Sequence, residues 1–221
     1  MLKSLVEAKI TANRQEILKK AVRPQVFLIL QLKHITTQEI LSIGNVHCIF
    51  GPVKLDVNAL YTALAMDKLL ELAQGGAHVI AGDFNSPTDK QTYKMLANGK
   101  LSETELDELN KMNSARLKHT SLSGALKDFY IHDSKSLKSS YLEVMTREPT
   151  FTCVDSRKTH KCNCDYIWFS SDHLTAVNTL DVNDIEPVKG DIRIPNGIYP
   201  SDHLSIKATL AFKEKRPNSR I

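Results

Sequence analysis

Two short segments of the sequence carry a carboxylate beside a second polar group, a pairing suited to phosphate chemistry. The first is Gly82-Asp83-Phe84-Asn85-Ser86, which follows the apolar run Ala77 to Ala81. Side chains two residues apart on an extended chain face the same side. The Asp83 carboxylate could therefore orient a water molecule while the Asn85 amide holds a phosphate oxygen. All these residue types also favour turns, so a plain turn is the alternative interpretation.

The second segment, Ser201-Asp202-His203, precedes the alternating stretch Leu204 to Phe212. A neighbouring carboxylate can hold an imidazole in its protonated form. An imidazolium can bind a scissile phosphate or give its proton to a leaving group. An ordinary loop histidine with an incidental acidic neighbour is the alternative.

Two expected strands carry further polar groups. Asn45 and His47 lie two residues apart and so share one face of their strand. A lone strand histidine is more often a satisfied core residue. Asp165 opens the stretch Asp165-Tyr166-Ile167-Trp168-Phe169-Ser170, where it marks either a solvated strand end or a carboxylate aimed into a cleft.

The sequence contains Cys48, Cys153, Cys162 and Cys164, the last three in one region together with His160. Structural zinc sites usually separate paired cysteines by two to four residues, whereas one residue separates Cys162 from Cys164. We therefore expect free thiols in a reducing compartment rather than a zinc site.

Hydrophobic patterning supplies the elements that would position these groups. The patterns predict five strands, a long helix ended by Gly75-Gly76, a polar helix-prone region and a surface helix. The strands are Val26–Leu32 (buried, in a hairpin with the next), Ile40–Phe50, Ala77–Ala81, Asp165–Ser170, and a closing fifth at Leu204–Phe212; the helical regions are Asn58–Ala73, Ser102–Leu126 and Leu137–Val144. Strands alternating with helices predict a single mixed α/β domain over residues 1–212 with a polar tail at 213–221.

Composition narrows the class of protein. Hydrophobic residues make up 42% and charged residues 24%, which is typical of a globular chain. The net charge of +4 allows a polyanionic partner without requiring one. No apolar run is long enough to cross a bilayer, and the first residues lack a secretory pattern. We expect an intracellular protein, cytoplasmic with the nucleus as the alternative, and no membrane partner.

The order of the motifs is more specific than any one of them. N-x-H, GDFNS, DYIWFS and Pro200-Ser201-Asp202-His203 follow one another before a closing strand. This order resembles the endonuclease/exonuclease/phosphatase superfamily. The resemblance spans Val26 to Phe212, and it is nearest to the group of nocturnin, the Angel proteins, the carbon catabolite repressor deadenylases and the 2′-phosphodiesterases.

The resemblance implies a four-layer α/β/β/α sandwich of the deoxyribonuclease I-like type. It also implies Mg²⁺ as cofactor, with Mn²⁺ as the alternative. Asp83 would orient the attacking water and Asn85 would contact the phosphate. Asp202 would bind the metal and His203 would stabilise the transition state. His47 and Asp165 would complete the phosphate-binding wall, and the expected substrate-binding residues are Asn45, Pro52 and His160.

One part of the family pattern does not match. The family carries a metal-binding glutamate in a Leu-Gln-Glu-Val motif on an early strand. Gln38-Glu39-Ile40 is similar to that motif but lies in the turn before the N-x-H strand. We expect Glu39 to be a solvent-facing residue of the hairpin turn and the chain to lack the first strands of the domain. Without that glutamate ligand, we expect its activity to be weak or absent.

The expected function is metal-dependent hydrolysis of RNA from its 3′ end, as a deadenylase-like exoribonuclease. One alternative is a phosphatase acting on terminal or cyclic phosphates of RNA or on a dinucleotide. Another is an inactive fragment that binds nucleic acid. The expected partner is the 3′ end of RNA, poly(A), or a phosphorylated nucleotide.

Overall fold

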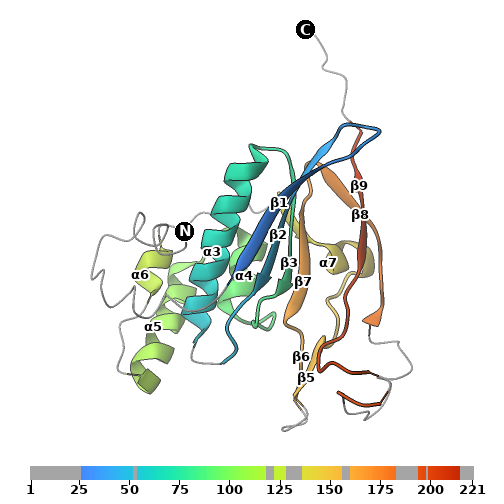
Figure 1. Ribbon diagram of the computed structural model, residues 1–221. Helices are drawn as coiled ribbons and strands as arrows, with labels where there is room; N and C mark the ends of the chain where they lie inside the picture. Colours follow the sequence, from blue (N-terminus) through green and yellow to red (C-terminus); the bar gives the residue numbers. More distant parts are fainter. Residues whose placement is uncertain are drawn as a thin grey trace.

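The computed structural model describes residues 26–51, 54–117, 122–127, 136–155, 160–182, 194–197 and 199–214. Its centre is a five-stranded sheet in the order β1-β2-β3-β7-β4 (Figure 1). The strands of this sheet are β1 (Phe27–Lys33), β2 (Ile40–His47), β3 (Ala77–Asp83), β4 (Leu137–Ser139) and β7 (Asp165–Ser170).

One face of the sheet is covered by helices. The long helix α3 (Leu55–Ala73) buries an almost continuous run of its residues against β2 and β3. With it on this side lie α4 (Gln91–Asn98), α5 (Glu103–Leu117) and α6 (Ser123–Leu126) (Figure 1). Ile80 of β3, Trp168 of β7 and Phe84, which directly follows β3, join the α3 side chains in this main core. This core holds in place the faces of β3 and β7 that pack against the helices.

The opposite face packs on a second, smaller sheet. It consists of β8 (Leu174–Thr179) and β9 (Ala208–Phe212), and its Leu174, Leu210 and Phe212 meet Val79 and Phe169 of the central sheet. A further ribbon, β5 (Cys153–Asp155) with β6 (His160–Cys162), lies near the lower end of the two sheets, and α7 (Ser140–Met145) lies beside β7 and β8 (Figure 1). The expected mixed α/β fold is confirmed, with helices on one sheet face and a second sheet on the other.

The expected hairpin, long helix and buried strands are confirmed, and three expectations need correction. β1 pairs with β2 at one side only, so Leu28 and Leu32 are half exposed rather than buried. The segment 137–144 begins as strand β4, and its α7 turn buries Tyr141. The last strand starts at 208, because His203 instead forms an isolated antiparallel bridge with Cys153 at the start of β5.

Gly82 allows the sheet to close where the candidate motif begins. Its φ is +134°, and a Cβ there would lie 2.0 Å from the Val46 carbonyl oxygen. No L side chain fits such an approach, so glycine is required for β3 to stay paired with β2 up to Asp83. In the described part of the chain, no helix has the length and apolarity needed to cross a membrane.

Candidate active site

Three of the predicted residues lie side by side at one edge of the central sheet. β2 and β3 run parallel and end together, and β7 starts at the same edge. The register therefore places His47 beside Asp83, and Asp83 beside Asp165. His47 Nε2 lies 3.5 Å from Asp83 Oδ2, with the imidazole largely exposed. The core-histidine interpretation of His47 is wrong, and its ring faces solvent above the sheet edge.

Asp83 and Asn85 form a tight turn that also aims the carboxylate. Asp83 Oδ1 accepts a hydrogen bond from the Asn85 backbone N–H at 2.7 Å, an arrangement of the Asx-turn type. The Asn85 amide donates to Asp83 Oδ2 at 2.9 Å and to the Cys48 carbonyl at 2.7 Å. Asn85 adopts a left-handed φ of 45°, which asparagine tolerates. Because both amide hydrogens are engaged, Asn85 in this arrangement positions Asp83.

His203 takes its carboxylate partner from another strand. Its Nδ1 lies 3.0 Å from Asp165 Oδ2, and this hydrogen bond raises the pKa of the His203 imidazolium to about 11. We expected the carboxylate of Asp202 in this role. Neighbouring residues on an extended segment point to opposite sides, and Asp202 is exposed while its carbonyl accepts from Val154 N–H.

The two pairs meet across a short gap. His203 Nε2 lies 4.0 Å from Asp83 Oδ2, so the imidazolium and the buried carboxylate face one another. Burial, followed by the charge of Asp165, raises the pKa of the Asp83 carboxyl to about 6, while the Asn85 hydrogen bond and the two histidines oppose this rise. A carboxylate that can accept a proton near neutral pH and a fixed cationic donor thus share one small space.

This space also contains a set of possible metal ligands. Ligand atoms of Asp83, Asp165, Cys164 and His203 all lie within 4.8 Å of one another. The two neighbouring carboxylates of Asp83 and Asp165 suit a hard divalent ion, because Mg²⁺ is bound through one or two carboxylates with water and phosphate oxygens. The thiol of Cys164 contributes nothing to such oxygen ligation.

Two supporting residues lacked any signal in the sequence. Asn58, fully buried on α3, exchanges hydrogen bonds with Ile49 through its Oδ1 (3.1 Å) and Nδ2 (2.9 Å). It thereby ties the end of β2 to the helix beside the site. Thr152 is also fully buried, and its Oγ1 donates to Asp165 Oδ2 at 2.6 Å. Only long-range pairing brings either residue to the site, so spacing could not identify them.

The same Thr152 hydroxyl accepts the backbone N–H groups of Cys164 and Asp165, each at 3.2 Å. The Thr152 hydroxyl is therefore hydrogen-bonded both to the backbone at the start of β7 and to the Asp165 carboxylate. These bonds fix the position of the carboxylate that pairs with His203 Nδ1.

The other predicted residues stand apart from this group. Asn45 shares the exposed face of β2 with His47, and its amide lies 3.4 Å from the Ala81 carbonyl. Pro52 lies outside the described residues, and for His160 only the backbone is described, in β6 opposite Asp155. Asp202 has no place in the ligand groups found among the described residues, so its metal role stays a prediction.

Glu39 lies at the far end of β2, in the turn between β1 and β2, where it accepts a hydrogen bond from Thr37. It lines a hollow of about 700 Å³ between the two sheets there, at the opposite end from Asp83. The expectation that Glu39 is a turn residue rather than the family's metal ligand agrees with this position.

All four cysteines are free thiols, as expected. Cys48 is buried against Thr62, and burial raises its pKa to about 12, so it remains neutral. The other three contact one another beside His203. Hydrogen bonds from Cys162 and Cys164 lower the pKa of the Cys153 thiol, and the imidazolium of His203 adds to that shift.

The known proteins that this chain is similar to agree with this architecture. A family model described as "Endonuclease/Exonuclease/phosphatase family" matches residues 11–203. The chain is 26% identical over 224 residues to the CCR4-Not complex 3′-5′-exoribonuclease subunit Ccr4 of Yarrowia lipolytica, and 26% identical over 215 residues to that of Saccharomyces cerevisiae. These alignments cover 88% and 90% of this chain but only 29% and 23% of the relatives' lengths.

Solved structures share the fold. A structure titled as ANGEL2, a 2′,3′-cyclic phosphatase, superposes with a TM-score of 0.64 at 22% identity, covering 88% of this chain and 62% of that one. The human Nocturnin catalytic domain with bound sulfate superposes with a TM-score of 0.56 at 20% identity, covering 86% and 54%. At these identities the likeness concerns the fold alone.

Proposed function

We propose, from the premise that this chain belongs to the endonuclease/exonuclease/phosphatase family, that its function is metal-assisted hydrolysis of phosphodiester bonds in RNA from the 3′ end. The observation that carries it is the meeting of Asp83, held by Asn85, with His203, held by Asp165, at one sheet edge. A buried carboxylate and a fixed imidazolium on either side of one space suit attack by water on phosphorus.

Each residue has a distinct part in this proposal. Asp83 orients the attacking water and accepts its proton, and the turn at Asn85 fixes the orientation of the carboxylate. His203 donates from Nε2 to a phosphate oxygen, since Asp165 engages Nδ1 and holds the ring protonated. His47, exposed and 3.5 Å from Asp83, adds a second donor at the mouth of the site.

Asp83 and Asp165 would hold a divalent cation, for which Mg²⁺ or Mn²⁺ is proposed, with Asp202 as a further candidate ligand. When bound, the ion would neutralise charge on the phosphate oxygens. The chain's own residues supply the water position and the proton transfer. Mg²⁺ usually keeps several positions for water and for phosphate oxygens of the substrate.

RNA is the proposed substrate because the matching curated relatives are named as 3′-5′-exoribonuclease subunits. The chain spans less than a third of their length, so activity on poly(A) and assembly with protein partners belong to the proposal. Asn45, Pro52 and His160 remain proposed contacts for the nucleotide, and an intracellular location, cytoplasmic or nuclear, is proposed with them.

The test is incubation of the 221-residue chain with a 5′-labelled RNA that ends in oligo(A), in the presence of Mg²⁺ or Mn²⁺. Products that shorten by one nucleotide at a time are expected. They should disappear with EDTA and in the Asp83→Asn variant. The exposed Asp89, six residues along the same loop, provides a matched control: Asp89→Asn should retain the activity of the parent chain.

Other outcomes would redirect the assignment. Release of inorganic phosphate from a 3′-phosphorylated RNA, or opening of a 2′,3′-cyclic phosphate, without shortening would identify a phosphatase. Metal-dependent binding of the RNA without turnover would identify a binding module. Turnover that survives both Asp83→Asn and His203→Gln would reject this site as the centre of the reaction.

A further inference from the structure

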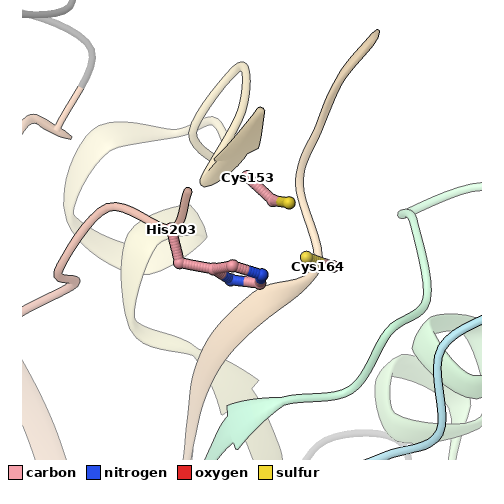
Figure 2. A group of neighbouring side chains, drawn as sticks. All are labelled: Cys153, Cys164 and His203. Carbon is pink, nitrogen blue, oxygen red and sulfur yellow. The ribbon is translucent and has the colours of Figure 1, made fainter. Parts of the chain in front are cut away.

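A second cluster of side chains that could bind a metal ion lies beside the candidate active site and shares His203 with it. Cys153, Cys164 and His203 each offer one ligand atom, and these atoms lie within 4.8 Å of one another. Figure 2 shows both sulfur atoms and the imidazole turned toward the same space. The function proposed above uses His203 and leaves the thiols without a role.

Backbone pairing explains why these side chains converge. Val154 N–H donates to the Asp202 carbonyl, and Leu204 N–H donates to the Thr152 carbonyl. This pattern makes Cys153 and His203 a directly opposed antiparallel pair without mutual hydrogen bonds, the type whose side chains lie closest.

On its other side, Cys153 stands opposite Cys162 in the β5–β6 ribbon. Cys164 follows two residues after Cys162, at the spacing that returns a side chain to the same face. The three thiols are in hydrogen-bonding contact with one another. Three sulfur atoms and one imidazole are therefore presented on one face by segments far apart in the sequence.

We propose that Cys153, Cys162, Cys164 and His203 form a binding site for a thiophilic metal ion of the Zn²⁺ class. A tetrahedral Zn²⁺ with bonds of about 2.0 to 2.3 Å separates its ligand atoms by about 3.3 to 3.8 Å. The ligand atoms of Cys153, Cys164 and His203 lie within 4.8 Å of one another, so small side-chain movements would reach this spacing. Cys162, opposite Cys153 in the β5–β6 ribbon, is the candidate for the fourth ligand. Thiolate and imidazole ligands select such an ion, whereas the two carboxylates next to them select Mg²⁺ or Mn²⁺.

The outer contacts of His203 suit coordination. A metal-binding histidine usually donates its second ring N–H to a carboxylate, which fixes the ring orientation. Asp165 already occupies Nδ1 at 3.0 Å, which leaves Nε2 for the metal. Nε2 is also the nitrogen assigned above to the phosphate.

Coordination would therefore remove His203 from the reaction, so a thiophilic ion would inhibit the enzyme. This regulatory half of the proposal rests on the proposed function. The metal site itself does not.

The binding test is a titration of the reduced, EDTA-treated 221-residue chain with Co²⁺, which reports its ligands by absorption. One equivalent should give tetrahedral d–d bands and a thiolate-to-cobalt charge-transfer band. Cys153→Ala and Cys162→Ala should each lower the charge-transfer intensity by about a third, since one of three thiolates is lost. Cys48→Ala is the matched control, because Cys48 is buried against Thr62 away from the cluster, and its spectrum should equal the parent's. An octahedral spectrum without charge transfer, or equal loss in the Cys48 variant, would overturn the site.

The link to His203 is measured without relying on turnover. Ring ¹⁵N signals of His203 should shift on addition of one equivalent of Zn²⁺ in the parent chain and stay unchanged in Cys153→Ala. In the Mg²⁺-supported RNA assay, the same equivalent should abolish most turnover of the parent but not of Cys153→Ala. His203 signals unmoved by bound Zn²⁺ would overturn the link. Normal Co²⁺ spectra in a chain without turnover would instead count against the proposed function alone.

Discussion

The two halves of the candidate site are built in different ways. Asp83 and Asp165 stand opposite each other on the neighbouring strands β3 and β7, so regular strand pairing sets their positions. Other residues of these two strands are packed in the two hydrophobic cores. His203 belongs to an irregular segment joined to Cys153 by one isolated bridge, and its orientation depends on side-chain hydrogen bonds. The comparison indicates that the acidic half is fixed by the fold and that the histidine half can respond to ligands.

The largest effect is expected from Asp83→Asn in the strand-built half. The change keeps the size of the side chain but removes the proton acceptor, so turnover should fall by about 10²- to 10⁴-fold. The thermal unfolding midpoint should change little, because burial already penalises the charged form of Asp83. Initial rates with saturating RNA and a melting curve measure both. Loss of folding in parallel with activity would mean that Asp83 is structural.

Gly82→Ala tests whether regular pairing fixes this half. The added methyl group would meet the Val46 carbonyl oxygen at 2.0 Å, so β2 and β3 must separate at the site. We expect a loss of about 3 kcal/mol or more in the free energy of unfolding, measured with urea. Gly124→Ala, whose new methyl group meets nothing within 4 Å, is the matched control and should be neutral or slightly stabilising. Equal stability of the two variants would contradict the close approach.

Thr152→Val tests the junction of the two halves. The isosteric change removes a hydroxyl that donates to Asp165 and accepts two backbone N–H groups, so these buried groups lose their partner. The expected cost in unfolding free energy is about 1–3 kcal/mol, with a clear fall in turnover. Thr152→Ser keeps the hydroxyl and should recover most of both. If Val and Ser behave alike, the hydroxyl does not hold Asp165.

The last prediction concerns the charge of His203. Its folded-state pKa, about 11, lies above the ordinary value of 6.5, mainly through the hydrogen bond to Asp165. The resulting stabilisation is therefore complete below pH 6.5 and is lost as the pH rises from 6.5 toward 11. In EDTA, ring signals of His203 should stay those of an imidazolium at pH 8, whereas in Asp165→Asn they should titrate nearer 6.5. Titration near pH 6.5 in the parent chain would contradict the pairing.

The strand-built half could be predicted from the sequence, and most of the other half could not. Asp83 follows one apolar run and Asp165 opens another, and the family resemblance of the ordered motifs implied that both line one phosphate site. The register of β3 and β7 places them opposite each other. The partner of His203 was assigned to its neighbour Asp202, because adjacency is visible in a sequence and a bridge across 38 positions is not. Thr152, Asn58 and the thiol cluster depend on the same kind of long-range pairing.

The most direct test is a crystal structure of the 221-residue chain with Mg²⁺ and a short oligo(A) whose last linkage is a phosphorothioate. We expect the phosphorus of that linkage to lie between the Asp83 carboxylate and His203 Nε2, with Asp165 still bonded to Nδ1. A linkage bound elsewhere, with the gap between Asp83 and His203 unchanged and filled only by solvent, would disprove this placement of the reaction.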